Sequence, residues 1–199
     1  MSSHDSAAMP APQRIPVFNI ANILTATRLV MVPLFVVFMF LEPPAWRFAA
    51  FAVFVVAAVT DRIDGELARR RNLVTDFGKV ADPIADKALT GAALVVLSIL
   101  GELWWWVTLA ILLRELGITV LRFAVMRYGV IPASRGGKLK TVLQVVAISV
   151  YLFPLPEQLL IIAHVSMGAA VAVTLWTGAD YVIQAIRLRG AQRGDTPEP

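Results

Sequence analysis

Residues 61–86 read DRIDGELARRRNLVTDFGKVADPIAD, and this stretch lies between two apolar segments, AAFAVFVVAAVT before it and KALTGAALVVLSIL after it. Four of its five aspartates are spaced along the two predicted helices at intervals of three or four residues: Asp61, Asp64, Asp82 and Asp86. An ionised carboxylate is costly at membrane depth, so a chain keeps one there mainly for a function. These four residues, called the motif aspartates below, are therefore the starting point for both fold and function.

The composition indicates a membrane protein. Of the 199 residues, 58% are hydrophobic and 16% are charged, whereas a soluble domain carries about 25% charged residues. The absence of cysteine excludes disulfides and thiolate metal sites. The net charge is +4, but the basic residues are concentrated in a few connections between apolar segments, so no nucleic-acid partner is expected.

Six segments are long and apolar enough to cross a bilayer. A helix that spans the hydrocarbon core, about 30 Å thick, needs about 20 mostly apolar residues. The segments lie near 20–41, 45–66, 79–100, 103–126, 138–154 and 158–187. The sequence therefore predicts an all-α polytopic membrane protein with six transmembrane helices in one domain, residues 14–188, and polar tails at 1–13 and 189–199.

The distribution of lysine and arginine predicts the orientation of these spans. Basic residues gather before span one, between spans two and three, between four and five, and after six: Arg14, Arg69, Arg70, Arg71, Arg127, Arg135, Lys138, Lys140, Arg187, Arg189 and Arg193. The opposite ends carry Glu42, Arg47, Glu102, Glu157 and the tryptophans 104–106, which are typical of an interfacial belt. Both termini and the motif aspartates are therefore expected on the cytoplasmic side.

The first two motif aspartates fall near the cytoplasmic end of span two. Asp61 and Asp64 are three residues apart, so they lie along one stripe of a helix. Gly65 and Ala68 continue the stripe, and their small side chains leave space for a ligand. Arg69, one residue further on, can reach a phosphate.

The other two motif aspartates lie on span three. Asp82 and Asp86 are four residues apart, and Gly78 precedes them at the same interval. Because spans two and three are antiparallel and joined by a short link, the two stripes can face each other at similar depth. Four ionised carboxylates at one place repel each other, and their oxygens are the ligands that Mg²⁺ prefers. Two divalent cations would neutralise the cluster.

Two other interpretations of the aspartates remain open. They could pair in a solvated loop with the basic residues around them: Arg62, Arg69, Arg70, Arg71, Lys79 and Lys87. They could also form the proton or cation relay of a transporter, which places acids near the middle of the membrane. The spans are apolar through their middles, which disfavours transport.

The stretch resembles the signature of the CDP-alcohol phosphotransferase family, D-x-x-D-G-x-x-A-R, eight residues, G, three residues, D, three residues, D. All the fixed positions are filled: Asp61, Asp64, Gly65, Ala68, Arg69, Gly78, Asp82 and Asp86. The six-span architecture of that family also agrees with the expected spans. Members move a substituted phosphate from a CDP-linked donor to an alcohol and release CMP, so the resemblance implies a membrane enzyme of this kind.

The resemblance also implies a role for each of these residues. The motif aspartates would hold two divalent cations, Mg²⁺ or Mn²⁺, and Asp86 would also take the proton of the acceptor hydroxyl. Gly65 and Ala68 would admit the cytidine of the donor. Arg69 and Gly78 would border the nucleotide pocket.

Sequences outside the stretch are similar to those of one bacterial subgroup of the family, the phosphatidylglycerophosphate synthases. They are NIANILTATRLVMVPLF from residue 19, GKVADPIADK from 78, RELGITVLR from 114 and GGKLKT from 136. The subgroup implies CDP-diacylglycerol as donor, sn-glycerol 3-phosphate as acceptor, membrane lipids as surroundings, a bacterial cytoplasmic membrane and a homodimer. Family members that use inositol phosphate, serine or phosphatidylglycerol are the alternative, and a non-catalytic cation-binding protein is a further one.

An anionic acceptor requires cations on the same side as the motif aspartates. Five basic residues meet this requirement and are expected to bind the acceptor phosphate: Arg28, Arg114, Arg122, Lys138 and Lys140. The alternatives are that Arg114 only pairs with the adjacent Glu115, and that the others serve topology or lipid headgroups. Asn22 and Thr25, in the cytoplasmic part of span one, are expected to contact the donor or else to join helices by hydrogen bonds.

Overall fold

The computed structural model describes residues 20–70, 76–125 and 135–194, and within these ranges the regular elements are all helical. There are six α-helices, α1 Ile20–Phe40, α2 Trp46–Arg70, α3 Asp76–Ile99, α4 Trp105–Val125, α5 Arg135–Leu152 and α6 Leu160–Gly194, and a short 3₁₀ helix, η2 Glu157–Leu159. An all-helical fold was expected, and each expected span coincides with one helix. Helices α2 and α6 continue as helices past the apolar segments that predicted them.

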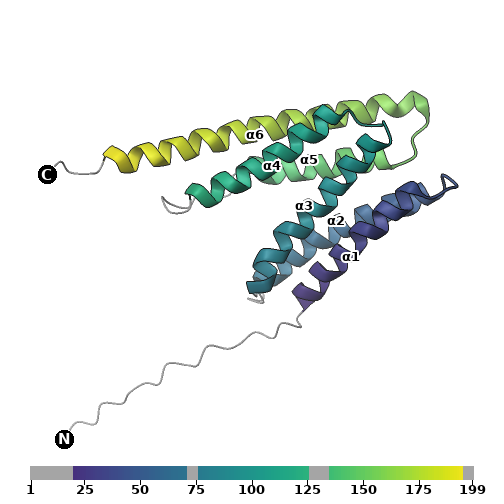
Figure 1. Cartoon of the computed structure of the whole chain (residues 1–199), viewed down its shortest axis with the longest axis horizontal. Coiled ribbons are helices and arrows are strands. Elements are labelled where there is room, and N and C mark those ends of the chain that lie inside the picture. Colours follow the sequence, from purple (N-terminus) through teal and green to yellow (C-terminus); the bar gives the residue numbers. More distant parts are fainter. Residues whose placement is uncertain (1–19, 71–75, 126–134, 195–199) are drawn as a thin grey trace, which may run out of the picture.

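Consecutive helices alternate in direction (Figure 1). The amino-terminal ends of α1, α3 and α5 lie at the same end of the molecule as the carboxyl-terminal ends of α2, α4 and α6. We call this the motif end, because the end of α2 and the start of α3 belong to it. The opposite end, called the turn end, holds the short connections between α1 and α2, between α3 and α4, and between α5 and α6.

Length and composition alone qualify one helix of the described ranges as a membrane span, Glu157–Arg187. Three shorter apolar helices are Leu24–Phe40, Trp46–Thr60 and Lys87–Ile99. These bounds apply to the described side chains, which exclude Asp61 and Asp86. The arrangement of six spans therefore stays a prediction.

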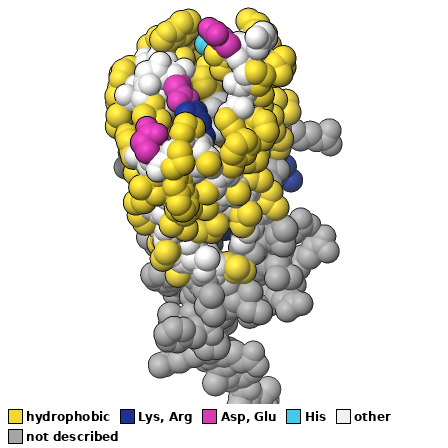
Figure 2. Space-filling model, turned by 90° about the vertical axis from the view of Figure 1, so that its right-hand side faces the viewer, with side chains coloured by type: hydrophobic (Ala, Val, Ile, Leu, Met, Phe, Trp, Pro, Cys, Tyr) yellow, Lys and Arg dark blue, Asp and Glu magenta, His cyan; other side chains and the backbone are white. Residues whose placement is uncertain are grey.

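The surface of the bundle is strongly apolar. Leu113 and Val120 on α4 and Ile161, Val165 and Ile186 on α6 are each between 64% and 68% exposed. Hydrophobic side chains also dominate the turn end, where acidic and basic groups are few (Figure 2). A monomeric soluble protein rarely exposes apolar patches of this extent, which mark contact with lipid or with a partner protein.

The core is built from large side chains of five helices with small ones between them. Its largest fully buried hydrophobic members are Phe35, Phe54, Leu94, Leu97, Ile111, Ile148 and Leu152. Phe35 of α1 packs on Phe54 of α2 with ring centroids 6.0 Å apart. Fully buried alanines such as Ala50, Ala93 and Ala147 let the helices approach closely, as small residues do in membrane bundles.

Arg47 fastens three elements at the turn end. Its guanidinium pairs with both carboxylate oxygens of Glu102, which lies in the connection between α3 and α4. It also donates to the carbonyl oxygens of Tyr151 at 3.0 Å and Leu152 at 3.3 Å, at the carboxyl-terminal end of α5. Carbonyls at a helix end lack partners within their own helix, so this arginine satisfies them while joining α2 to α5.

Replacing Arg47 by lysine should lower the stability of the bundle. A lysine ammonium is a point donor and cannot reproduce the planar, bidentate contact with Glu102 together with the two carbonyl bonds. We expect the free energy of unfolding to fall by about 2 kcal/mol, measured by thermal unfolding in detergent with tryptophan fluorescence. Arg187→Lys, on an exposed part of α6, is the control; equal effects of the two substitutions would contradict the role of Arg47.

Candidate active site

The motif aspartates lie on the two helices that meet at the link between Arg70 and Asp76. Asp61 and Asp64 are nine and six residues before the end of α2, and Asp82 and Asp86 are six and ten residues after the start of α3. At about 1.5 Å per residue, Asp64 and Asp82 each lie about 9 Å along the helix axis from the link, and Asp61 and Asp86 lie about 14 and about 15 Å from it. The two helices also contact each other, so the backbone brings the pairs to similar heights.

The side chains of the motif lie outside the described residues. This applies to the four aspartates and to Gly65, Ala68, Arg69, Gly78 and Asn22. Their expected roles therefore stay predictions. Among the side chains that the structure describes, no three or more of His, Cys, Asp or Glu form a group that could hold a metal ion.

Helix α1 contributes two buried polar residues near the motif end. Thr25 and Arg28 are each 3% exposed. Helix α1 packs against both α2 and α3, the helices that carry the motif. A buried arginine is rare in a protein interior, because transferring its charge out of water requires compensating partners. Arg28 is thus a buried cation on a helix that packs against both helices carrying the motif aspartates.

Arg114 is anchored to α6 by its guanidinium group. Its Nε donates to the carbonyl oxygen of Thr174 at 3.1 Å, and its Nη2 donates to Oγ1 of Thr177 at 2.9 Å. Its side chain is 13% exposed. The close approach depends on Gly178, because a Cβ there would lie 3.2 Å from both Cγ and Nε of Arg114. Three residues of one turn of α6 therefore hold this arginine in place.

Glu115 joins Arg114 to a cation from another helix. Its Oε1 accepts a hydrogen bond from Nη1 of Arg114 at 3.1 Å, and the same oxygen accepts one from Nζ of Lys140 on α5. The side chains of Glu115 and Lys140 are 19% and 8% exposed. The pair between Arg114 and Glu115, which the sequence offered as the alternative role of Arg114, is present, and it is part of a larger cluster that also contains Lys140.

A second chain of hydrogen bonds joins this cluster to α3. Nζ of Lys87 donates to Oγ1 of Thr119, which in turn donates to the carbonyl oxygen of Glu115 at 2.7 Å. Lys87 directly follows Asp86 in the sequence. We call Lys87, Arg114, Glu115, Thr119 and Lys140 the cation cluster. It holds three cations and one carboxylate, so its described charges sum to a net positive value.

The structure separates the cations that the sequence grouped together. Arg114 and Lys140 share one carboxylate oxygen, whereas Arg122 and Lys138 are exposed. Sequence reasoning assigned no role to Thr119, Thr174 or Thr177. It considered Glu115 only as the alternative partner of Arg114. The sequence carried one signal for these residues. On an otherwise apolar helix, two polar residues such as Glu115 and Thr119 lie one helical turn apart.

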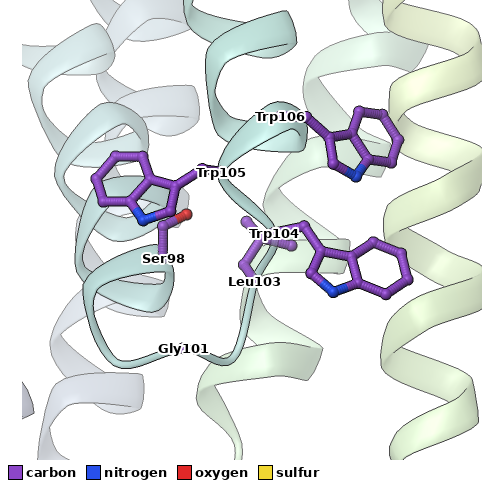
Figure 3. Close-up of a pocket in the computed structure, with 6 residues that line it drawn as sticks. All are labelled: Ser98, Gly101, Leu103, Trp104, Trp105 and Trp106. Atoms are coloured by element: carbon purple, nitrogen blue, oxygen red, sulfur yellow. The ribbon is translucent and has the colours of Figure 1, made fainter.

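A hollow at the turn end has a different character. It measures about 620 Å³ and is lined by Ser98, Gly101, Leu103 and the tryptophans 104–106. The indoles of Trp104 and Trp106 extend to one side with centroids 6.3 Å apart, while Trp105 extends to the other side, toward Ser98 (Figure 3). Exposed indoles with one hydroxyl nearby suit the interfacial belt expected from the sequence and offer no set of groups for catalysis.

A sequence model of the CDP-alcohol phosphatidyltransferase family matches residues 18–176, which include the whole motif and the cation cluster. The chain belongs to this family. Its helical fold, with the motif on two adjoining helices, is thus the fold of a family member.

Several relatives are similar over most of the chain. A protein of Mycobacterium tuberculosis named probable phosphatidylglycerophosphate synthase is 54% identical, covering 90% of this chain and 88% of its own. Proteins named CDP-diacylglycerol–glycerol-3-phosphate 3-phosphatidyltransferase are 39% identical in Escherichia coli and 35% identical in Bacillus subtilis. The alignment with the Escherichia coli protein covers 84% of this chain and 95% of that protein. The alignment with the Bacillus subtilis protein covers 82% of this chain and 93% of that protein.

Substituting Gly178 by alanine should disturb the anchoring of Arg114. The added methyl group would need the arginine to move, yet three hydrogen bonds hold its guanidinium. Overpacking of this kind costs roughly 1 to 3 kcal/mol, so we expect a lower unfolding temperature. Gly168→Ala is the matched control on the same helix, because a Cβ there meets nothing within 4 Å. Equal unfolding temperatures for the two variants would contradict the tight contact.

Proposed function

We propose that the chain is a membrane-embedded phosphatidylglycerophosphate synthase. It moves the phosphatidyl group of CDP-diacylglycerol to sn-glycerol 3-phosphate, giving phosphatidylglycerophosphate and CMP. The observation that carries this proposal is the relative at 54% identity, which aligns over 90% of the chain and is named for this function. The relatives in Escherichia coli and Bacillus subtilis, whose names state both substrates, support the same choice of donor and acceptor.

The proposed setting is the bacterial cytoplasmic membrane, with all six helices as spans and the motif end on the cytoplasmic side. The apolar surface of α4 and α6 supports contact with lipid. The excess of arginine and lysine in the connections at the motif end supports the orientation. The donor lipid would then present its nucleotide where water-soluble glycerol 3-phosphate arrives.

The donor set fits two divalent cations. The motif supplies four carboxylates as two pairs at similar heights on α2 and α3, and carboxylate oxygens are the hard ligands that Mg²⁺ and Mn²⁺ take. Asp61, Asp64, Asp82 and Asp86 would hold them. When bound, these ions would offset the charge of the donor diphosphate and the charge that develops as the phosphorus is displaced.

The acceptor phosphate binds to the cations at the motif end. Arg114 and Lys140 are the centre of this site because Glu115 holds them together, and Arg28, Arg122 and Lys138 add positive charge around it. Arginine binds a phosphate through two parallel N–H bonds, whereas lysine acts as a point charge. With the phosphate fixed there, the hydroxyl at carbon 1 of glycerol 3-phosphate is turned toward α3.

Transfer then forms one bond and breaks one. The acceptor hydroxyl oxygen attacks the phosphorus that carries the diacylglycerol, and the bond from that phosphorus to CMP breaks. Asp86 takes the hydroxyl proton. On the donor side, Gly65 and Ala68 leave space for the cytidine, while Asn22, Thr25, Arg69 and Gly78 border the nucleotide.

The choice of acceptor is tested with purified protein, CDP-diacylglycerol and Mg²⁺. We expect CMP release to require sn-glycerol 3-phosphate and to equal the amount of labelled glycerol 3-phosphate that enters lipid. Inositol phosphate and serine are the comparison acceptors, and they should support far slower release. Faster turnover with either would assign the chain to another branch of the family. No CMP release with any acceptor would favour a non-catalytic protein.

The role of the motif is tested by Asp61→Asn. Because the amide removes one negative ligand, we expect the rate of CMP release to fall by at least about 100-fold and the Mg²⁺ concentration for half-maximal activity to rise. The control is Asp180→Asn on α6, since Asp180 is exposed and accepts a hydrogen bond from Gln184 at 2.8 Å. Its activity should be unchanged. Full activity of Asp61→Asn would remove the metal cluster from the mechanism.

A further inference from the structure

The carboxylate of Glu115 is the feature that sets the distance between two cations from different helices. We propose that Glu115 is a positioning residue, which holds Arg114 and Lys140 at the separation that one phosphate group of the acceptor can bridge. This inference rests on the proposed function, because it assumes an acceptor that carries a phosphate. Glu115 itself does not touch the substrate.

The geometry supports this role through a single oxygen atom. Both Nη1 of Arg114 and Nζ of Lys140 donate to Oε1 of Glu115. Two donors within hydrogen-bond reach of the same oxygen are at most about 6 Å apart, a span that two oxygens of one phosphate can cover. Without the carboxylate, two cations at this distance repel each other.

The charges of the cation cluster favour an anionic ligand. The described cluster contains three cations, Lys87, Arg114 and Lys140, and one carboxylate, so Glu115 offsets only part of its positive charge. The cluster is also largely shielded, with Arg114 13% and Lys140 8% exposed. Shielding from water strengthens the attraction between such cations and a bound anion.

Glu115 is also tied through its backbone to the helix of the proposed base. Its carbonyl oxygen accepts from Thr119, and Thr119 accepts from Lys87, the residue after Asp86 on α3. Arg114 in turn is fixed to α6 through Thr174 and Thr177. The cluster therefore relates the acceptor phosphate to α3, so that phosphate binding also orients the attacking hydroxyl.

The test compares Glu115→Gln with the wild type. Glutamine keeps the shape and one accepting oxygen but loses the charge that holds both cations. We expect the KM for sn-glycerol 3-phosphate to rise about tenfold, the effect of about 1.4 kcal/mol, with the KM for CDP-diacylglycerol unchanged. Glu115→Asp keeps the charge on a shorter side chain, so it should restore part of the lost affinity. A KM for glycerol 3-phosphate that stays the same or falls would overturn the proposal.

The matched control is Glu102→Gln at the turn end. It removes a carboxylate that is likewise paired with an arginine, but one far from the motif end. We expect this variant to lower the unfolding temperature and to leave both KM values unchanged. If Glu102→Gln raised the KM for glycerol 3-phosphate as much as Glu115→Gln does, the effect would come from loss of stability, and the positioning role would be wrong.

A failure of the proposed function is distinguished by the wild-type acceptor panel. If the wild type uses inositol phosphate instead of glycerol 3-phosphate, the proposed function is wrong, and the same variants are measured with inositol phosphate. A raised KM for that acceptor in Glu115→Gln would still support the positioning role. A wild type that prefers serine, which carries no phosphate, would contradict both.

Discussion

A charged side chain on an apolar helix is stable only beside a partner that satisfies it. The cost of removing an ion from water is several kcal/mol, and a salt bridge recovers it only when further hydrogen bonds complete the site. This constraint explains where the described charges of the bundle lie. Arg47 pairs with Glu102 at the turn end, and Arg114 and Lys140 pair with Glu115 in the cation cluster, while residues such as Phe54, Leu94 and Ala93 fill the core.

The turn end and the cation cluster satisfy the constraint in different ways. At the turn end, Arg47 and Glu102 balance each other, and the remaining donors of the arginine meet carbonyls of α5. In the cation cluster, the carboxylate of Glu115 accepts from two cations, and a third cation, Lys87, donates to a threonine hydroxyl. The Arg47–Glu102 pair joins helices, whereas the cation cluster, whose described residues include three cations and one carboxylate, is the site proposed to receive an anion.

The proposed acceptor site depends on four helices, and only one of them, α3, also carries part of the motif. Helix α4 supplies Arg114 and Glu115, α5 supplies Lys140, α6 fixes Arg114, and α3 connects to Glu115 through Lys87 and Thr119. A family that varies its acceptor alcohol can therefore keep the motif for the donor and the cations. The proposed acceptor site, on the later helices, would be free to differ.

The sequence by itself determined the order of helices, the motif and the family. The helices follow because each apolar segment needs internal hydrogen bonding, and the motif is evident because Asp61 to Asp86 are fixed by spacing along two adjoining helices. Only the tertiary structure decided which cations meet. Glu115 and Lys140 are 25 residues apart on different helices, and the packing of α4, α5 and α6 sets their contact. Local spacing gives no such information, so it could not separate Arg114 and Lys140 from the exposed Arg122 and Lys138.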